Sequence, residues 1–309
     1  MSNQFSYGGQ AVIEGVMIRG QRFFSLAVRR PSGEITSSCE ALSPLYTGRL
    51  RRFPLVRGVV VLIETLVLGV KVLNRSASLA MQDEGQGTQE IPRWAMGLTL
   101  MVALAIGIAL FFLTPLFAAR SLDAYIRSDF LSNLLEGVVR LAILVGYIKV
   151  IGAMSDIRRV FMYHGAEHMA VHAYEAREPL EVERVRPFPT AHPRCGTAFL
   201  LVVMVVAILV FALLGRPPLL WSILSRVLLI PVIAAISYEI IRFSGAHQGN
   251  PLVRLVMLPS LWLQGLTTRQ PDDSQIEVAV HAMRGAIAAD EGQPLAEEAP
   301  QPAAESDPD

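Results

Sequence analysis

The chain is poor in charged residues, and this shortage restricts what kind of protein it can be. Only 17% of its 309 residues are charged, 52% are hydrophobic, and the mean hydropathy is +0.43. That composition excludes an ordinary soluble domain and predicts a membrane protein. The net charge is formally zero, and no run of lysine and arginine is interleaved with aromatic residues. We therefore expect no nucleic-acid partner.

Cysteine is also scarce, and a secretory signal is missing. The first twenty residues lack a basic start followed by an apolar run and a small-residue cleavage site, so we expect the N-terminus to stay in the cytosol. The chain has only Cys39 and Cys195, which lie far apart in the sequence. A structural disulfide is disfavoured in a reducing compartment, so each cysteine is expected to be a free thiol or a ligand.

Four hydrophobic segments are predicted to cross a bilayer, whose hydrocarbon core of about 30 Å requires about 20 residues of helix. The segments at 94–117 and 197–214 contain no charged residue. Those at 131–153 and 219–241 contain a few charges but remain apolar enough to cross. The sequence therefore predicts a mainly α-helical, polytopic membrane protein with about four transmembrane helices.

Charges inside the spans need partners, because an unpaired charge at mid-bilayer costs about 3 kcal/mol or more. Glu136 and Arg140 lie four residues apart on one helical face and can pair with each other. This pair either lowers the cost of burying the two charges in lipid or takes part in transport, and the sequence does not decide between the two. Arg226 in the fourth span has no evident partner in the sequence.

The distribution of basic residues predicts the orientation. Lysine and arginine are concentrated before residue 94, between 155 and 195, and after 241, and they are scarce in the short connections at 118–130 and 215–218. Because basic residues stay on the cytoplasmic side, we expect both termini and the histidine-rich loop 155–195 in the cytoplasm.

The N-terminal third divides into two predicted parts. Residues 1–57 are expected to form a small β-rich cytosolic module, since strand-like runs at 23–30 and 34–40 flank a Pro-Ser-Gly turn. Residues 58–93 are expected to hold an interfacial helix and a linker, because a further crossing would upset the charge distribution.

The C-terminal region follows the predicted membrane domain, which covers residues 94–270. Within that domain the segment 251–266 is apolar but short and interrupted by Pro259, which favours a helix that lies on the surface or re-enters the membrane. Ser274 and Glu277 form a capping-box pattern that predicts an amphipathic helix over 271–288. The acidic residues 289–309 are expected to be a disordered tail.

The pattern HxxEH is the main chemical signal in the chain, formed by His164, Glu167 and His168. Two imidazoles four residues apart on a helix lie on one face and can bind one divalent ion. The order of residues is the reversed zinc-protease signature, in which the glutamate acts on metal-bound water. We therefore predict a divalent transition metal at His164 and His168, with zinc as the first choice, and Glu167 as the catalytic base.

A catalytic zinc site needs a third protein ligand and one open position. Two further segments bring candidates to the same membrane plane: His192 and Cys195 precede the third span, whereas Glu239 and His247 lie at the end of the fourth. Any of these four residues can complete the site, and the sequence leaves the choice open. Each also has a structural explanation, since an interfacial histidine is often a hydrogen-bonded anchor and a cysteine a small buried apolar residue.

Four sequence blocks resemble a known family: GGQAVIEGVMIRG at 8–20, HGAEH, AHPRCGT, and LWLQGLTTRQPDDSQIEVAV near the C-terminus. They are similar to the YqhQ-like family of bacterial membrane proteins, and the resemblance covers about residues 8–284. It implies a multi-pass protein of the bacterial inner (cell) membrane. Because members are catalogued as predicted metal-dependent enzymes, it also implies a metal-dependent activity, without indicating a substrate.

Three functions are compatible with these patterns. The first is a membrane metallohydrolase that faces the cytosol, contacts membrane lipid, and cleaves an amide or ester bond in an interfacial peptide or a lipid-linked substrate. The second is a non-catalytic scaffold or assembly factor that binds protein partners through its cytosolic modules. Ion transport ranks last, because the spans at 94–117 and 197–214 do not supply facing polar residues.

Overall fold

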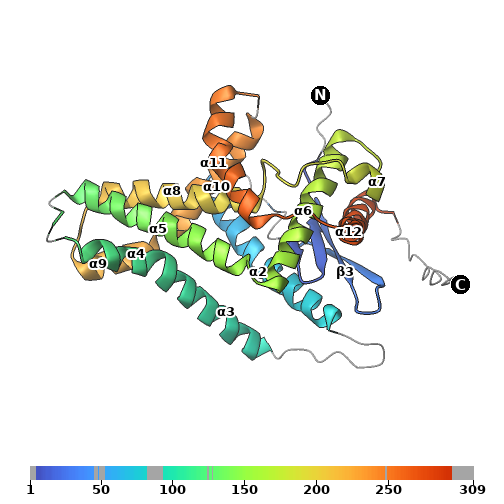
Figure 1. Ribbon diagram of the computed structural model, residues 1–309, viewed down its shortest axis with the longest axis horizontal. Helices are drawn as coiled ribbons and strands as arrows, with labels where there is room; N and C mark the ends of the chain where they lie inside the picture. The colour runs from blue at the N-terminus through green and yellow to red at the C-terminus, as the bar shows by residue number, and fades with distance from the viewer. Residues whose placement is uncertain are drawn as a thin grey trace, which may run out of the picture.

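The fold is described from a computed structural model, which covers residues 5–44, 48, 53–81, 93–123, 125–126, 128–247 and 249–293. A bundle of long helices occupies one end of the molecule, and a small sheet with its covering helices occupies the other (Figure 1). The chain is thus mainly helical with a small antiparallel sheet, as predicted.

The sheet has four strands joined by consecutive hairpins in the order β1-β2-β3-β4. Their bounds are Gly8–Val12, Gly15–Arg19, Phe23–Arg29 and Ile35–Ala41. The predicted strand-like runs match β3 and β4, and the turn between them has Gly33 at φ +90°, a backbone conformation that glycine adopts without strain. The β-rich N-terminal region is therefore confirmed.

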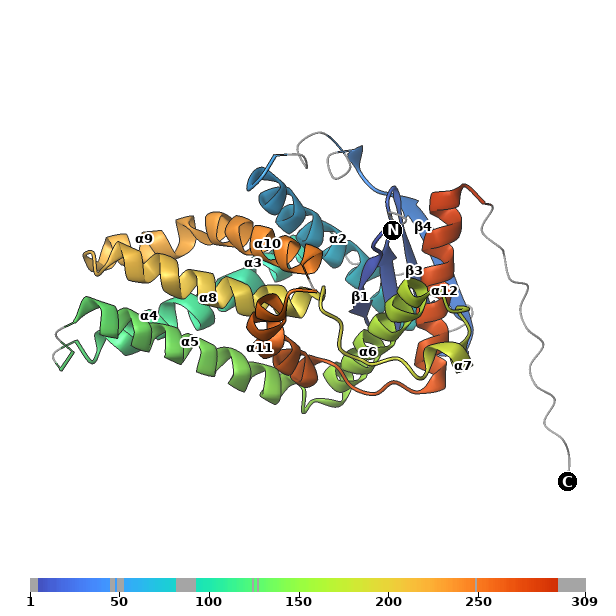
Figure 2. The same ribbon diagram turned by 90° about the horizontal axis from the view of Figure 1, so that it is seen from above.

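Both faces of the sheet are covered by helices from distant parts of the sequence (Figure 2). Val16, Ile18 and Ala27 point to one face, where they share a core with α6 (Ser155–Ala176) and α12 (Asp273–Glu291). The alternate residues of β2 and β3 point to the other face and pack on α2 (Val56–Ala80). This alternation follows from the period of two along a strand. The N-terminal strands therefore share their core with the C-terminal helix and have none of their own.

The C-terminal helix begins and ends at residues that differ from the prediction. Its capping box is formed by Asp272 and Gln275, and the predicted pair Ser274 and Glu277 is wrong. The helix reaches Glu291, since the Asp290 carboxylate accepts hydrogen bonds from the backbone of the β2–β3 turn, at 2.6 and 2.9 Å. Residues 294–309 of the predicted acidic tail lie outside the described residues.

The bundle contains two or three helices that can cross a membrane by length and composition. One runs over Gly97–Arg120 and combines α3 (Arg93–Ile108), the π-helical turn η2 (Ala109–Leu113) and α4 (Thr114–Arg120). The second is α8 (Gly196–Leu214). The helices α9 (Leu219–Leu228) and α10 (Ile230–Ala246) meet at a bend of 46° and make a third if they form one broken span. The helix α5 (Asp129–Ile151), which matches the remaining predicted span, is not among these candidates, so four crossings stay a prediction.

Three buried charges hold the bundle together. Glu136 accepts hydrogen bonds from Arg140 at 2.6 Å and from Arg226 at 2.8 Å, so the predicted pair within α5 extends to α9. Arg140 also donates to the carbonyl of Phe111 in the π-helical turn, and both guanidinium groups lie against the ring of Phe211. The two arginines are 1% exposed. These contacts support a structural role for the charges.

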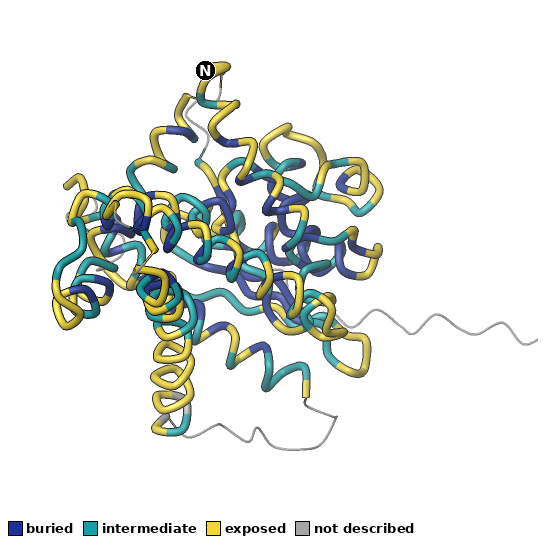
Figure 3. The backbone as a smooth tube through the Cα atoms, turned by 60° about the vertical axis from the view of Figure 1, so that its left-hand side comes forward, coloured by how far each residue is buried: buried dark blue, intermediate teal, exposed yellow. Residues whose placement is uncertain are grey.

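Two remaining helices connect the bundle to the sheet. The helix α2 packs between the sheet and α10, and α11 (Pro251–Thr267) contains Pro259 and contacts α5 and α8. Buried positions gather where these elements meet, whereas the outer sides of the helices are exposed (Figure 3). The predicted interfacial placement of α2 and of the segment 251–266 stays a prediction.

We expect the substitution Glu136→Gln to destabilise the protein by about 3–5 kcal/mol, because it leaves two buried guanidinium groups without a counter-charge. Thermal unfolding in detergent measures the effect. The matched control is Lys149→Gln on the exposed side of the same helix, which should change the stability by about 0.5 kcal/mol or less. Equal shifts for the two variants would contradict the structural role of the charges.

Candidate metal centre

The helix α6 presents the HxxEH residues toward the junction with α8 and α11. It begins directly after α5 and ends where Arg177 adopts a left-handed conformation at φ 60°. His168 and Glu167 are buried, and His164 is partly exposed. The predicted helical spacing is confirmed, since the rings of His164 and His168 lie 4.4 Å apart between centroids.

Cys195 lies beside these rings because it caps the N-terminus of α8. Its Sγ accepts a hydrogen bond from the backbone N–H of Thr197 at 3.3 Å and lies 3.2 Å from Nε2 of His164. A helix N-terminus favours negative charge, which suits a thiolate ligand. His164, His168 and Cys195 offer ligand atoms that all lie within 4.8 Å of one another, and we call these three residues the His–Cys group.

Backbone carbonyls orient both imidazoles of the His–Cys group. Nδ1 of His164 lies 2.9 Å from the carbonyl oxygen of Thr267, and Nδ1 of His168 lies 2.6 Å from that of Thr190. Because a carbonyl oxygen can only accept, Nδ1 of each ring carries a proton, and in the neutral form of each ring Nε2 then keeps a lone pair that can bind an ion. This arrangement is typical of metal-binding histidines, whose second nitrogen donates to a carbonyl or carboxylate.

The spacing of the ligand atoms fits a small transition metal. Ligands at zinc-type bond lengths in a tetrahedral site lie about 3.3–3.6 Å from one another. The separation between His164 Nε2 and Cys195 Sγ, 3.2 Å, is close to that range. This pair can therefore accept an ion with movements of a few tenths of an ångström, and all three ligand atoms lie within 4.8 Å of one another.

Glu167 lies at the edge of the group, with one carboxylate oxygen 3.5 Å from Nε2 of His168. Its side chain is 5% exposed, so the carboxylate is withdrawn from bulk water. Strand β1 passes directly over it at Gly9, where an added Cβ would lie 3.0 Å from Cγ of Glu167. The glycine at the start of the chain thus leaves room for the predicted catalytic residue.

A second set of polar side chains lies next to the His–Cys group: His172 and Glu175 of α6 and His192 of the loop before α8, which we call the histidine network. The rings of His172 and His192 lie 4.5 Å apart, and Nε2 of His192 lies 3.4 Å from Glu175. Burial lowers the pKa of both histidines. Glu175 also forms an ion pair with Arg194.

The histidine network suits hydrogen bonding better than metal binding. Nδ1 of His192 accepts a hydrogen bond from the backbone N–H of Arg194 at 3.3 Å, so the proton of the neutral ring resides on Nε2, the atom that faces Glu175. That nitrogen then has no lone pair for an ion. His192, one of the predicted ligands, therefore lies beside the His–Cys group without joining it, whereas Cys195 is part of the group.

Two other predicted ligands lie elsewhere, and this corrects the sequence analysis. Both carboxylate oxygens of Glu239 bind Arg57 on α2, and one also accepts from the backbone N–H of Leu55 at 3.1 Å. His247 is exposed, and its ring stacks on Phe243 one turn earlier in α10. The common membrane depth of these residues was insufficient to predict contact, since α10 turns Glu239 toward α2.

Sequence reasoning missed Gln264 of α11, which is fully buried. Its side-chain amide accepts from the backbone N–H of His192 and donates to the backbone carbonyl of the same residue, both at 2.9 Å. This reciprocal pair attaches the loop before α8 to α11. The only signal in the sequence was a glutamine inside an otherwise apolar segment.

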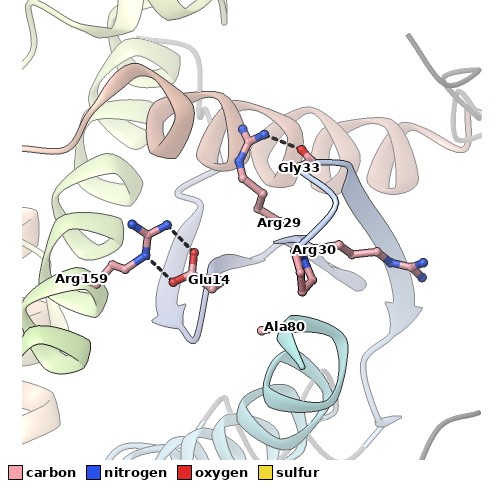
Figure 4. Close-up of a pocket in the computed structure, with 7 residues that line it drawn as sticks. Glu14, Arg29, Arg30, Gly33, Ala80 and Arg159 are labelled. Atoms are coloured by element: carbon pink, nitrogen blue, oxygen red, sulfur yellow. Dashed lines mark hydrogen bonds and ion pairs between the residues drawn. The ribbon is translucent and has the colours of Figure 1, made fainter. Parts of the chain in front are cut away.

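A separate cavity of about 460 Å³ lies between the sheet, the end of α2 and the start of α6 (Figure 4). Two of its arginines are engaged, since Arg159 pairs with Glu14 and Arg29 donates to the carbonyl of Gly33 at 2.7 Å, and Arg30 also lines the cavity. None of the His–Cys group lines this cavity, and we assign it no role.

Comparison with known proteins agrees with the resemblance in the sequence blocks. Residues 53–289, which include every residue of the His–Cys group, match the family described as "Protein of unknown function (DUF1385)". The chain belongs to this family. It is also 34% identical over 290 residues to "Uncharacterized protein YqhQ" of Bacillus subtilis (strain 168), covering 90% of this chain and 91% of the relative. No solved structure matches.

We expect Gly165→Ala to disrupt the junction that orients His164. An added Cβ would lie 2.3 Å from the backbone oxygen of Arg269, in the segment that also carries Thr267. Overpacking of this kind costs about 1–3 kcal/mol, which thermal unfolding should detect. The control is Gly146→Ala in α5, where an added Cβ meets nothing within 4 Å and the gain in helix propensity should stabilise by about 0.5–1 kcal/mol. A stabilised Gly165→Ala variant would contradict this packing.

Proposed function

We propose that this DUF1385 protein is a membrane-bound, metal-dependent hydrolase whose ion is held by His164, His168 and Cys195. The observation that carries the proposal is the hydrogen-bonding pattern of the His–Cys group: both Nδ1 atoms lie against backbone carbonyls, so in the neutral rings both Nε2 atoms remain as ligands. The thiol of Cys195 lies next to them at the end of another helix.

The residues present divide into three ligands and one base. Mixed imidazole and thiolate ligation favours zinc or iron over magnesium or calcium. A zinc-type ion supplies two effects, since it lowers the pKa of a bound water to about 7 and polarises the oxygen of a scissile bond. With an ion bound, Glu167, which is buried beside His168, would act as the general base toward water and then as the general acid toward the leaving group.

The position of the group favours a substrate at a membrane surface. It lies where α8, an apolar candidate span, begins and where α6 leaves the bundle. We place this junction on the cytoplasmic side of the bacterial inner membrane, with four crossings and both termini in the cytoplasm. The substrate is then an amide or ester bond in an interfacial peptide or a lipid-linked molecule, and membrane lipid is a partner.

A non-catalytic scaffold is the second candidate, and one observation favours it. Both ring nitrogens of His164 have partners within the protein, Thr267 and Cys195, so the histidine can act as a purely structural link. In that case the sheet layer, which consists of β1–β4 with α6 and α12, binds protein partners. The metal content of the purified protein distinguishes the two functions.

The purified protein should contain about one equivalent of zinc or another transition metal, as expected for a single site with three protein ligands. The double variant His164→Ala, His168→Ala should lose this metal, because the remaining thiol cannot hold it alone. Elemental analysis by mass spectrometry measures the content. His247→Ala is the matched control, since that histidine lies outside the group, and it should keep the metal. Equal metal in the two variants would remove the proposal.

Glu167→Gln should keep the metal and lose activity, because the amide has the shape of the carboxylate but cannot accept the proton of water. We expect a loss of about 10²–10⁴-fold in rate. The assay follows metal-dependent release of water-soluble products from vesicles of bacterial polar lipid by mass spectrometry. A variant that retains both metal and rate would show that Glu167 is not the base.

A further inference from the structure

The helix α11 exposes an apolar surface that no described part of the chain covers. Leu252, Leu255, Val256 and Leu258 are 53–69% exposed, and Trp262 is 60% exposed. Several large apolar side chains so close together are rare on a protein surface in water. The surface therefore has a partner, and the surrounding structure indicates which kind.

The direction of α11 separates it from the membrane-crossing helices. Figure 1 shows α11 running across the direction of α5 and α8, and Figure 2 shows it nearly end-on while α5 and α8 lie in the plane of the view. Its second half packs on these helices through Leu263 and Leu266. Its first half projects away from the bundle, close to the boundary between the bundle and the sheet layer. A helix in that place lies along a bilayer surface if α8 crosses the bilayer.

The composition of α11 suits the headgroup region of a bilayer. Over Pro251–Thr267 the one charged residue is Arg254, which is exposed beside the apolar surface. A basic side chain beside apolar side chains that insert into a bilayer favours anionic headgroups. Tryptophan is common at the depth of the headgroups. The helix itself contains no acidic residue.

The opposite face of α11 supports the candidate metal centre. Gln264 holds the backbone of His192 through its reciprocal hydrogen bonds, and the carbonyl of Thr267 accepts from His164. The hydroxyl of Thr267 also lies 3.3 Å from that of Thr197 at the start of α8. Lipid contact on one side of this helix would therefore be linked to the positions of His164 and of the loop that precedes Cys195.

We propose that α11 binds anionic phospholipid in the leaflet nearest the sheet, and that this contact holds His164 and the loop before Cys195 in place. The part that concerns the metal centre rests on the proposed function, whereas lipid binding by α11 does not. Lipid is the occupant that the crosswise placement of α11 beside α8 favours. A second copy of the chain or another protein is the competing occupant.

The direct test uses tryptophan fluorescence in the full chain, with Trp94→Phe and Trp221→Phe so that Trp262 is the remaining tryptophan. The protein is reconstituted in vesicles of phosphatidylcholine and phosphatidylglycerol with bromine at carbons 6 and 7 or at carbons 11 and 12 of the acyl chain. We expect stronger quenching by the shallow bromines. No quenching by either lipid would overturn the proposal. In that outcome, a disulfide between Leu255→Cys residues of two copies would identify a second copy as the occupant.

The link to the site is tested with Leu255→Glu combined with Val256→Glu, two exposed positions far along α11 from the ligands. We expect quenching of Trp262 to fall at least twofold and the metal content of the vesicle-bound protein to fall with it. The matched control is Ile13→Glu, which places one such charge at an exposed apolar position on the sheet layer and should change neither quantity. If the double variant loses the quenching of Trp262 but keeps its metal, the link between lipid contact and the site is overturned. If Trp262 of the parent protein is quenched but that protein holds no metal, the proposed hydrolase function is refuted and the lipid contact stands.

Discussion

His164 joins three segments that lie far apart in the sequence, and the candidate site depends on this junction. The ring extends from α6, donates to the carbonyl at the end of α11, and faces the thiol that caps α8. Both helix ends supply groups that helical hydrogen bonding leaves over: the carbonyl of Thr267 is in the last turn of α11, and Sγ of Cys195 accepts from the N–H of Thr197 in the first turn of α8. The C-terminal end of α11 and the N-terminal end of α8 therefore both contact the imidazole of His164, and the candidate site lies between these two helix ends.

The same junction explains why α11 and the loop before α8 are attached so firmly. Gln264 pairs with both backbone groups of His192, and the peptide of Arg269 donates to the carbonyl of Phe161 on α6. Buried backbone groups need partners, and a loop that crosses a helix must obtain them from side chains. These bonds place Thr190 and Thr267 where their carbonyls orient the two imidazoles. The groups that orient the candidate ligands therefore belong largely to the backbone.

Outside the candidate metal centre, the buried charged residues pair with one another. The bundle buries Glu136, Arg140 and Arg226 as a mutually paired set, and α2 pairs Arg57 with Glu239. A guanidinium group keeps its charge when buried, so it requires a carboxylate and neighbouring carbonyls in the same place. The histidines have a different requirement, since a neutral imidazole needs one acceptor and can leave its other nitrogen for a ligand.

The sequence alone determined the helical character of the chain, the strands β3 and β4, the pairing of Glu136 with Arg140, and the shared face of His164 and His168. All of these follow from periodicity and short spacing, which act within one element or one hairpin. Only the tertiary structure decided that Cys195 joins the two histidines while His192, Glu239 and His247 do not, and that the first strands share a core with the last helix. Such choices depend on how α8, α10 and α11 are rotated about their axes, and rotation is set by packing between elements that the local pattern of residues does not encode.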